Sequence, residues 1–363
     1  NKKKSKENYK LVVAGCVAQA EGIEIQKRAP SVDFVVGPQS YHKLPEMIDK
    51  EEQKINNDFL PNEKFNNLVF NTSNGVSEFV SIQEGCDKFC TFCVVPYTRG
   101  PEYSRSFNEI INEAKQLINN GTKEIILIGQ NVNAYSFKKS NKIYRLSDII
   151  LELDKFSEIE RIRYTTSHPR DMTDDLINCY KTSKKLMPLI HLPIQSGSNK
   201  ILKLMNRKHN IETYLSIYEK LKNINNNIKF SSDFIIGYPG ETEKDFSETL
   251  NLVKRLNFIN SFSFIFSPRP GTTASKLKTI EKSITDNRLK IIQNELFKIQ
   301  IDRNKTLEKK VVEVLVENQM KDKIKLFGRT EYMTPVIFDG NFQYVGKIVK
   351  VEITSSNKNT LFG

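Results

Sequence analysis

The sequence predicts an α/β protein: a partial barrel of six strand–helix units, preceded by part of a small α/β domain and followed by a small all-β barrel. Three observations support this fold class. Strand-like and helix-like segments alternate between residues 77 and 267, short strands dominate residues 304–363, and a distinctive motif follows each strand of the middle region. Strict alternation of strands and helices is typical of a parallel sheet covered by helices. We therefore expect three parts, at residues 1–60, 72–303 and 304–363.

The middle part contains six apolar runs of strand length. In chain order they are EFVSIQ (78–83), EIILIG (124–129), RIRYTTS (161–167), LIHLPIQ (189–195), IKFSSDFIIG (228–237) and SFSFIFS (261–267). Helical patterns lie between them, and the first is preceded by Ser106 with Glu109 three residues later, which predicts a capping box. Six such units are fewer than a closed barrel of this type contains, so we expect a partial one.

The two flanking parts are smaller. Residues 10–55 predict two strand–helix units, with strands at YKLVVAGC and VDFVVG, and an asparagine-rich stretch at 55–76 predicts a linker. Residues 304–363 carry short β-rich runs such as VVEVLVEN and KIKLFGRTE, separated by turns. This pattern predicts a small five-stranded barrel, of the kind that binds RNA.

Composition narrows the class of protein. The 363 residues are 38% hydrophobic and 27% charged, which is typical of a folded globular chain. No apolar run approaches the ~18 residues of a membrane span, and the basic start NKKKSKENYK leads into no signal-peptide core, so we expect a cytoplasmic protein without a membrane anchor. The net charge of +12 favours a polyanionic partner such as RNA, although a lysine-rich and asparagine-rich proteome would raise it equally.

Three of the five cysteines, Cys86, Cys90 and Cys93, lie within eight positions of the segment EGCDKFCTFCVVPYTRG. Clustered thiols in a reducing compartment indicate metal ligands rather than disulfides. A structural zinc would need a fourth ligand, and the four histidines are all distant in sequence: His42, His168, His191 and His209. A cubane iron–sulfur cluster held by three thiolates keeps one iron open for a substrate. The cysteines alone therefore allow either metal centre.

Each predicted strand of the barrel ends in a motif that a plain turn does not need. The cysteines follow the first strand, and GQNVNAY, SHPR, QSGSN, GYPGE and SPRPGT follow the next five in order. Parallel strands place their carboxyl ends at one edge of the sheet, where the reactive residues of such barrels lie. We expect all of these motifs on one rim, which favours an enzyme over a protein that only binds RNA.

The motifs together carry a resemblance to a known family. CxxxCxxC after the first strand of a six-unit barrel resembles the radical S-adenosylmethionine (SAM) enzymes, and the fuller set, with TTSHP and HLPIQSGSNKILKLMNR, resembles their methylthiotransferases. The resemblance covers nearly the whole chain, and the tail resembles that family's TRAM domain. The nearest branch, indicated by VVPYTRG and GQNVNAY, adds a methylthio group to C2 of dimethylallyladenosine beside the anticodon of tRNA, at position 37.

The resemblance implies roles for particular residues. Cys86, Cys90 and Cys93 would hold a [4Fe–4S] cluster whose open iron chelates SAM. Reductive cleavage of SAM would give the 5′-deoxyadenosyl radical, which would remove the hydrogen atom from C2 of the adenine before sulfur is inserted there. Contacts with SAM are then expected from residues on the other strand ends: Gln130, Asn131, Gln195, Arg207, Gly237, Gly240 and Glu241. The alternative is that these glutamines and glycines only shape their turns.

Cys16 resembles the last of three cysteines that hold a second, sulfur-donating [4Fe–4S] cluster in this family. The two earlier cysteines would precede Asn1, so we expect an N-terminally incomplete chain that assembles one of the family's two clusters. A buried core position is the alternative for Cys16, and it is the expected one for Cys179.

The implied partners are tRNA, through an anticodon stem-loop that carries dimethylallyladenosine, and an electron donor such as flavodoxin or ferredoxin. The chain itself is expected to be a monomer. Basic side chains beside aromatic ones suit contact with phosphate and stacking on unpaired bases. RNA contacts are therefore expected from Arg99, Arg105, Lys325, Arg329, Lys347 and Lys350, the alternative being that these side chains solvate the surface.

Other functions stay open on the sequence. Related enzymes methylthiolate threonylcarbamoyladenosine in tRNA, or an aspartate of a ribosomal protein. A non-catalytic RNA-binding protein, whose fold is stabilised by zinc or by an inert cluster, would use the same cysteines. The colour of the purified protein distinguishes an iron–sulfur enzyme from a zinc-stabilised RNA-binding protein, since the first is brown and the second is colourless.

Overall fold

The computed structural model describes residues 9–50, 54–58, 64, 65, 74–321 and 323–363, which form two compact units. The first unit takes its described residues from Asn1–Val69, Glu84–Tyr103 and Ser267–Leu277, and the second from Phe70–Gln83, Ser104–Phe266 and Lys278–Gly363. Most of the linker predicted at 55–76 falls at 59–63 and 66–73, outside the described residues. Throughout the described part of the chain, no helix combines the length and the apolar character needed to cross a membrane.

The first unit contains a small parallel sheet with the strand order β1-β2-β3. Its elements are β1 (Val12–Ala14), α1 (Cys16–Glu21), α2 (Ile23–Arg28), β2 (Phe34–Val36), a 3-10 helix at Pro38–Lys43, α3 (Leu44–Lys50) and β3 (Ile55–Asn56), followed later by α4 (Val95–Thr98). Successive residues of β2 bury their side chains in two different apolar clusters, as expected for a strand covered on both faces. β3 corrects the predicted linker, which begins with a strand too short to show a hydrophobic pattern.

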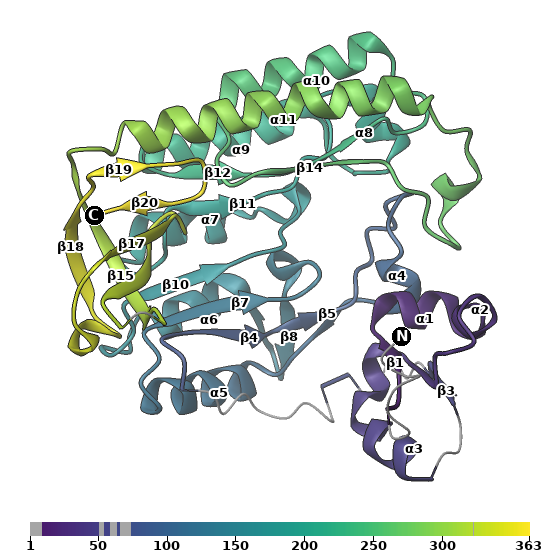
Figure 1. Ribbon diagram of the computed structural model, residues 1–363, viewed down its shortest axis with the longest axis horizontal. Helices are drawn as coiled ribbons and strands as arrows, with labels where there is room; N and C mark the ends of the chain where they lie inside the picture. Colours follow the sequence, from purple (N-terminus) through teal and green to yellow (C-terminus); the bar gives the residue numbers. More distant parts are fainter. Residues whose placement is uncertain (1–8, 51–53, 59–63, 66–73, 322) are drawn as a thin grey trace. The chain divides into compact units, whose positions relative to one another are not determined.

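The second unit is built on parallel strands in the order that the sequence predicts (Figure 1). Three of them pair side by side: β4 (Ser77–Ser81), β7 (Glu124–Ile128) and β10 (Arg161–Tyr164). β11 (Leu189–His191) pairs with β12 (Lys229–Ser231), and β13 (Asp233–Ile236) pairs with β14 (Phe262–Ile265). Single parallel bridges, Ile162 with Leu186 and Gln195 with Phe234, continue the order between these groups. β12 and β13 are two halves of one predicted strand.

Helices cover the outside of this partial barrel, and Figure 1 shows α9, α10 and α11 along one side of it. The helices are α5 (Phe107–Asn119), α6 (Leu146–Leu153), α7 (Asp174–Thr182), α8 (Asn199–Leu204), α9 (Ile211–Ile224), α10 (Glu243–Leu256) and α11 (Lys282–Lys305). The capping box predicted at Ser106 is wrong, because its side chain makes no cap hydrogen bond. A capping box is present instead on α10, between Thr242 and Asp245. β8 (Ser136–Lys139) and β9 (Lys142–Arg145) form a short antiparallel pair in this unit, and β5 (Gln83–Glu84) pairs with β6 (Tyr103–Ser104).

One apolar core lies between the strands and their helices. Successive strands contribute fully buried side chains to it: Val80, Ile125, Ile162, Ile190 and Phe234. Near-continuous apolar strands of this kind are expected in a parallel sheet that is covered by helices. The core therefore fixes the strand ends, and with them the loops that carry the polar motifs.

The tail forms one six-stranded sheet among its described residues, in the order β18-β15-β16-β17-β20-β19. The strands are β15 (Val311–Gln319), β16 (Lys325–Thr330), β17 (Pro335–Asp339), β18 (Ile348–Glu352), β19 (Ser355–Ser356) and β20 (Leu361–Phe362). The predicted number of five strands is too low, because β19 and β20 are too short to show alternation. The tail belongs to the same compact unit as the barrel, although the sequence pattern changes at 304.

The loop at 329–334, between β16 and β17, joins the tail to the barrel. Arg161 on β10 donates to the carbonyl oxygen of Arg329 at 2.8 Å. Arg163, two residues further on, donates to the carbonyl oxygens of Thr330 at 3.2 Å and Glu331 at 2.8 Å. Both barrel arginines are buried, and a buried cation is stable only when its donors are paired. We call this segment the 329–334 loop.

Candidate active site

The cysteine loop of the first unit runs from β5 to α4 and carries Cys86, Cys90 and Cys93. Gly85 has φ +84° and no room for a side chain, since a Cβ there would lie 2.0 Å from the carbonyl oxygen of Pro101. The amide of Cys86 donates to Gly100 at 3.1 Å, and the amide of Cys93 donates to Cys90 at 2.9 Å. Backbone contacts thus hold the three thiols on one short, closed loop.

The chemistry of this donor set suits a soft metal centre, because thiolates are the ligands of iron–sulfur clusters and of zinc. All three cysteines are reduced thiols rather than disulfides, and burial raises the pKa of the Cys86 thiol to about 12. Within the part of the chain that the structure describes, no three Cys, His, Asp or Glu side chains already converge in a metal-binding geometry. The thiols are gathered on one loop, close enough for Cys90 and Cys93 to contribute to the raised pKa of Cys86.

Cys16, at the start of α1, is brought to the cysteine loop by Arg99. The Arg99 Nε donates to the Cys16 Sγ at 3.4 Å, while its Nη1 lies 3.1 Å from the Glu84 carboxylate. Arg99 is half-buried in these contacts, and its contact with RNA stays a prediction. The structure places a cation beside the thiol that the sequence singled out for a second cluster.

Polar side chains follow the first two barrel strands of the second unit. The side-chain oxygen of Gln83 accepts hydrogen bonds from the backbone amides of Gln130 at 3.0 Å and Asn131 at 2.9 Å. The Asn131 side chain in turn donates to Asp171 at 2.8 Å, and Asn131 is buried. Gln83 and Asp171 were not predicted as site residues, because neither stands in one of the motifs and both are recognised only by their partners. Together they orient the GQN segment.

The next strand end carries Gln195 and Arg207. Gln195 is buried with a φ of +76°, a left-handed conformation that is costly for a residue with a side chain. Its backbone bonds in both directions across the sheet, to Asp233 and to Ile235. The Arg207 guanidinium, also buried, donates to the carbonyl oxygen of Pro193 at 2.6 Å. Both predicted residues thus lie at one strand end, turned inward rather than toward solvent.

The GYPGE motif forms the end of β13. Gly237 and Gly240 have φ of +70° and +88°, which residues with side chains rarely adopt. The Glu241 carboxylate accepts the amide of Gly237 at 2.9 Å and pairs with Arg288 of α11 at 2.9 Å. Burial raises the pKa of Glu241, while that amide and Arg288 favour its charged form. Glu241 therefore shapes the loop.

Replacing Gly237 by alanine is expected to destabilise the protein by about 2–3 kcal/mol, through the left-handed backbone and overpacking together. A Cβ at this position would lie 2.3 Å from the Thr285 Cγ2. Gly240→Ala is the matched control, because its Cβ would meet only Leu204 at 3.4 Å. Urea denaturation followed by circular dichroism measures both. Thr285→Ser in the Gly237→Ala background should recover part of the loss, and equal costs for the two glycines would contradict the steric argument.

Two histidines meet at the same rim. The rings of His168 and His209 pack edge to face, with centroids 5.5 Å apart. Burial, together with the nearby Arg207 guanidinium, lowers the pKa of His209 to about 4. His209 is thus neutral in the folded protein, whereas the unfolded chain binds its proton at about pH 6.5.

The folded protein should lose stability as the pH falls from about 6.5 to about 4, because in that window only the unfolded chain protonates His209. The expected loss is about 1–3 kcal/mol, and the contribution is fully present above this window. His209→Asn should flatten the profile measured by urea denaturation at pH 7 and pH 5. His42→Asn, at an exposed position in the first unit, is the control. A profile that keeps its slope in His209→Asn would refute the assignment.

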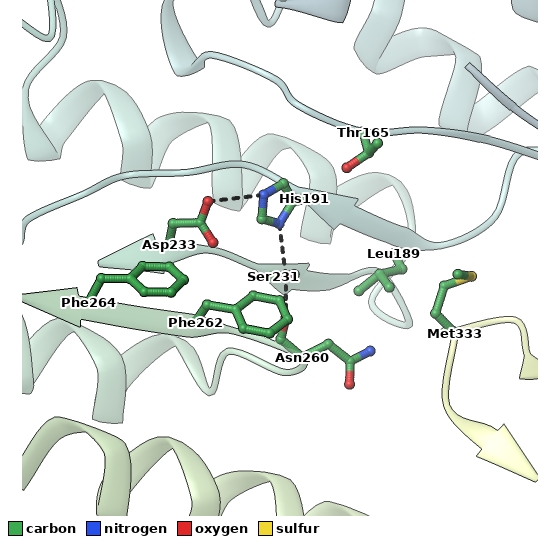
Figure 2. Close-up of a pocket in the computed structure, with 9 residues that line it drawn as sticks. All are labelled: Thr165, Leu189, His191, Ser231, Asp233, Asn260, Phe262, Phe264 and Met333. Atoms are coloured by element: carbon green, nitrogen blue, oxygen red, sulfur yellow. Dashed lines mark hydrogen bonds and ion pairs between the residues drawn. The ribbon is translucent and has the colours of Figure 1, made fainter. Parts of the chain in front are cut away.

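A cavity of roughly 480 Å³ opens among the barrel strands of the second unit. Figure 2 shows His191 at its centre, with dashed contacts to Ser231 and Asp233. The His191 Nδ1 lies 3.0 Å from the Ser231 Oγ, and its Nε2 lies 3.5 Å from the Asp233 carboxylate. Phe262 and Phe264 of β14 form another wall. No motif predicted these aromatic residues as part of a site, since their alternation reads equally as an ordinary strand.

The residues expected to contact RNA separate into two groups. Arg105 is 2% exposed and pairs with Glu113 and Glu109, so the structure does not support an RNA contact for it. Arg329 pairs with Glu317 and lies over the Phe327 ring at 5.0 Å. The lysines of the tail are exposed on its sheet and its turns: Lys325, Lys347 and Lys350.

Comparisons with known proteins match the chain along its length. Residues 80–253 match the Radical SAM superfamily, and residues 305–363 match the TRAM domain. The tRNA-2-methylthio-N(6)-dimethylallyladenosine synthase of Pelagibacter ubique (strain HTCC1062) is 63% identical over 359 residues, which cover 97% of this chain and 80% of that protein. The protein of the same name from Rickettsia akari (strain Hartford) is 50% identical over 361 residues, covering 97% of this chain and 81% of that protein.

A solved structure shares the fold at low identity. The cobalamin-dependent S-adenosylmethionine radical enzyme OxsB, with aqua-cobalamin and S-adenosylmethionine bound, has a TM-score of 0.53 and 14% identity, covering 79% of this chain and 44% of that chain. This likeness supports the fold alone. The identity to the Pelagibacter protein extends over nearly the whole chain and most of the relative. The chain therefore belongs to the family of the tRNA-2-methylthio-N(6)-dimethylallyladenosine synthases, within the radical SAM methylthiotransferases.

Proposed function

We propose that this chain adds a methylthio group to C2 of N6-dimethylallyladenosine at position 37 of tRNA. The observation that carries the proposal is the 63% identity to a relative of that name over 97% of the chain. Three thiols on one loop and polar residues at successive strand ends support it, since radical chemistry needs both a cluster and a held cosubstrate. A TRAM domain at residues 305–363 supports an RNA substrate.

Cys86, Cys90 and Cys93 are the residues that would hold the SAM-binding [4Fe–4S] cluster, and their soft donor atoms and single-loop placement fit it. When bound, this cluster with SAM supplies the one-electron cleavage that gives a carbon radical able to remove a hydrogen atom from an unreactive C–H bond. The closed backbone around Gly85 keeps the thiols on one loop before any metal arrives. An electron donor such as flavodoxin or ferredoxin completes the proposal.

Binding and orientation of SAM are assigned to the rim of the second unit. Gln83 holds the amides of Gln130 and Asn131, so the two side chains of the GQN segment are presented on a preorganised backbone. Gly240 leaves a stretch of backbone without a side chain, which allows the close approach of a flat adenine, whereas at Gly237 the space of a side chain is filled by Thr285. Gln195 and Arg207 are assigned to the ribose and the carboxylate, because a guanidinium is the side chain that pairs best with a carboxylate.

A second cluster is part of the proposal, with Cys16 as the ligand that this chain offers to it. Arg99 lies beside the Cys16 thiol and would balance the negative charge of a thiolate there. RNA contacts are assigned to the exposed lysines of the tail, Lys325, Lys347 and Lys350, which suit phosphate, and to Phe342, which is 64% exposed and suits stacking on an unpaired base.

The experiment that tests the proposal measures 5′-deoxyadenosine. The protein is reconstituted anaerobically with iron and sulfide, reduced with dithionite and given SAM. It is compared without RNA and with anticodon stem-loops that carry adenosine, N6-dimethylallyladenosine or N6-threonylcarbamoyladenosine. We expect the product to rise most with the dimethylallyl RNA. No product from protein that holds about four irons per chain would overturn the enzymatic function.

The same preparation separates the competing functions. A brown protein that bleaches with dithionite carries a redox-active cluster, whereas a colourless protein that holds zinc would favour the RNA-binding alternative. A rise only with the threonylcarbamoyl RNA would assign the related tRNA reaction. A rise with a peptide from the aspartate-containing ribosomal protein, and with no RNA, would assign the protein substrate.

A further inference from the structure

The cavity of the second unit is closed in part by the tail. Figure 2 shows Met333, on the ribbon of the 329–334 loop, facing the cavity alongside Leu189 of the barrel. Met333 has a φ of +61°, a left-handed conformation that a methionine adopts only when its surroundings enforce it. The cavity is therefore not a property of the barrel alone, and its far wall is built by a domain that was expected only to bind RNA.

The 329–334 loop is clamped to the barrel by the three residues that precede Met333. The carbonyl oxygens of Thr330 and Glu331 accept from Arg163, and that of Tyr332 accepts from the Asn260 side chain at 2.8 Å. The Tyr332 hydroxyl donates to Asn227 at 2.9 Å. Because Asn260 also lines the cavity, the loop is held against the site that Met333 enters. These contacts explain why the backbone of Met333 is held in the left-handed conformation.

The wall made by β14 is aromatic and accessible. Phe262 and Phe264 stand two residues apart on one face of the strand, and their rings are nearly parallel at 13° with centroids 6.5 Å apart. They are 59% and 55% exposed, which is unusual for two neighbouring phenylalanines. A flat base and an apolar group are the ligands that such a surface attracts. The cavity volume of roughly 480 Å³ lies in the range of pockets that hold small ligands.

The charges of the cavity separate the possible substrates. Among the nine described residues that line it there is no lysine or arginine, and Asp233 contributes a carboxylate. A threonylcarbamoyl group and an aspartate side chain both carry a carboxylate, which Asp233 would repel. His191, the one lining group able to carry a positive charge, already faces Asp233 at 3.5 Å. The dimethylallyl group is neutral and apolar, and fits beside Leu189, Phe262 and Met333 without an unpaired charge.

We propose that the 329–334 loop closes this cavity over the N6-dimethylallyl group of the substrate adenosine, and that Met333, Phe262 and Phe264 set the preference for that group. The tail then selects the modification already present on the base, in addition to any contact with the RNA backbone. His191, held between Ser231 and Asp233, forms the polar side of the same cavity. This inference rests on the proposed function, because it names the part of that substrate which the cavity holds.

The test is the binding of two stem-loops of one sequence that differ only in the N6-dimethylallyl group, measured by fluorescence anisotropy. The protein should bind the dimethylallyl RNA at least about tenfold more tightly than the unmodified RNA. Met333→Gly should remove most of this ratio by weakening the binding of the dimethylallyl RNA. Glycine suits the backbone at φ +61°, so this variant deletes the side chain without adding strain. Phe264→Ala should act in the same direction.

Matched variants make the outcomes decisive. Met320→Ala removes a methionine side chain elsewhere in the tail and should keep the ratio, and Met333→Leu should keep most of it because an apolar side chain remains. A ratio that survives both Met333→Gly and Phe264→Ala would overturn the inference. Equal weakening of both RNAs would also overturn it, since Met333 would then only support RNA docking.

The failure of this inference and the failure of the proposed function are distinguishable. If 5′-deoxyadenosine forms with the dimethylallyl RNA while Met333→Gly leaves the binding ratio intact, only the inference fails. If protein loaded with its cluster makes no 5′-deoxyadenosine, the function fails whatever the ratio. Tighter binding of the threonylcarbamoyl stem-loop than of the unmodified one would contradict the charge argument directly.

Discussion

Cys90→Ser is expected to abolish SAM cleavage and to lower the iron content of the reconstituted protein from about four per chain to near none. A serine hydroxyl remains protonated and is a hard donor, so it does not replace a thiolate on iron. Cys90 is the buried cysteine of the loop, 7% exposed, and its carbonyl oxygen accepts the amide of Cys93. Iron analysis, absorbance in the visible range and 5′-deoxyadenosine formation measure the effect.

Cys179→Ser is the matched control for this result. Cys179 lies on α7 at 1% exposure, and burial raises the pKa of its thiol to about 12, so it is a core thiol rather than a ligand. This variant should keep its iron and its activity while losing about 1 kcal/mol of stability. If Cys90→Ser bound iron and cleaved SAM as the parent protein does, the assignment of the cluster to this loop would be wrong.

Arg163→Met is expected to destabilise the second unit by about 3–5 kcal/mol, because it leaves the Glu124 carboxylate buried without its cation. The Arg163 Nε lies 2.7 Å from that carboxylate, and the exposed fractions of the two side chains are 6% and 2%. The same substitution removes two donors to the 329–334 loop. Urea denaturation followed by circular dichroism measures the free energy of unfolding.

Two further variants show whether the charge is the cause. Arg145→Met breaks an exposed pair with Asp175 at 3.6 Å and should cost less than about 1 kcal/mol. Arg163→Met combined with Glu124→Gln removes both charges and should recover much of the loss, leaving the cost of the unpaired carbonyl oxygens. A cost for Arg163→Met no larger than that for Arg145→Met would show that the buried pair does not hold the tail to the barrel.

The partial barrel and its rim could be predicted from the sequence because both depend on local patterns. Each strand shows as an apolar run, and the parallel order places Gln130, Gln195 and Gly237 at strand ends without knowledge of any contact. The cysteine loop is equally local, with Cys86 and Cys93 close in sequence. These features can be placed from short-range sequence patterns and strand order, without knowing any contact between residues that are distant in sequence.

The parts that were missed depend on contacts between distant residues. Arg99 and Arg105 carry the charge that RNA requires, yet Arg99 meets Cys16 and Arg105 meets Glu113, and charge alone does not reveal a partner. Gln83 acts through backbone amides 47 and 48 positions away. Met333 enters the cavity only because the tail folds back on the barrel. A single sequence does not specify such pairings.

The clamp on the 329–334 loop limits how this protein can be recombined. A tail grafted from a relative would bring its own loop to Arg161, Arg163 and Asn260, and a mismatch would both loosen the tail and open the cavity wall at Met333. Working chimaeras should therefore exchange the loop together with these three barrel residues. The barrel and the tail then determine substrate specificity together and have to be exchanged together, although the sequence pattern changes clearly at their boundary.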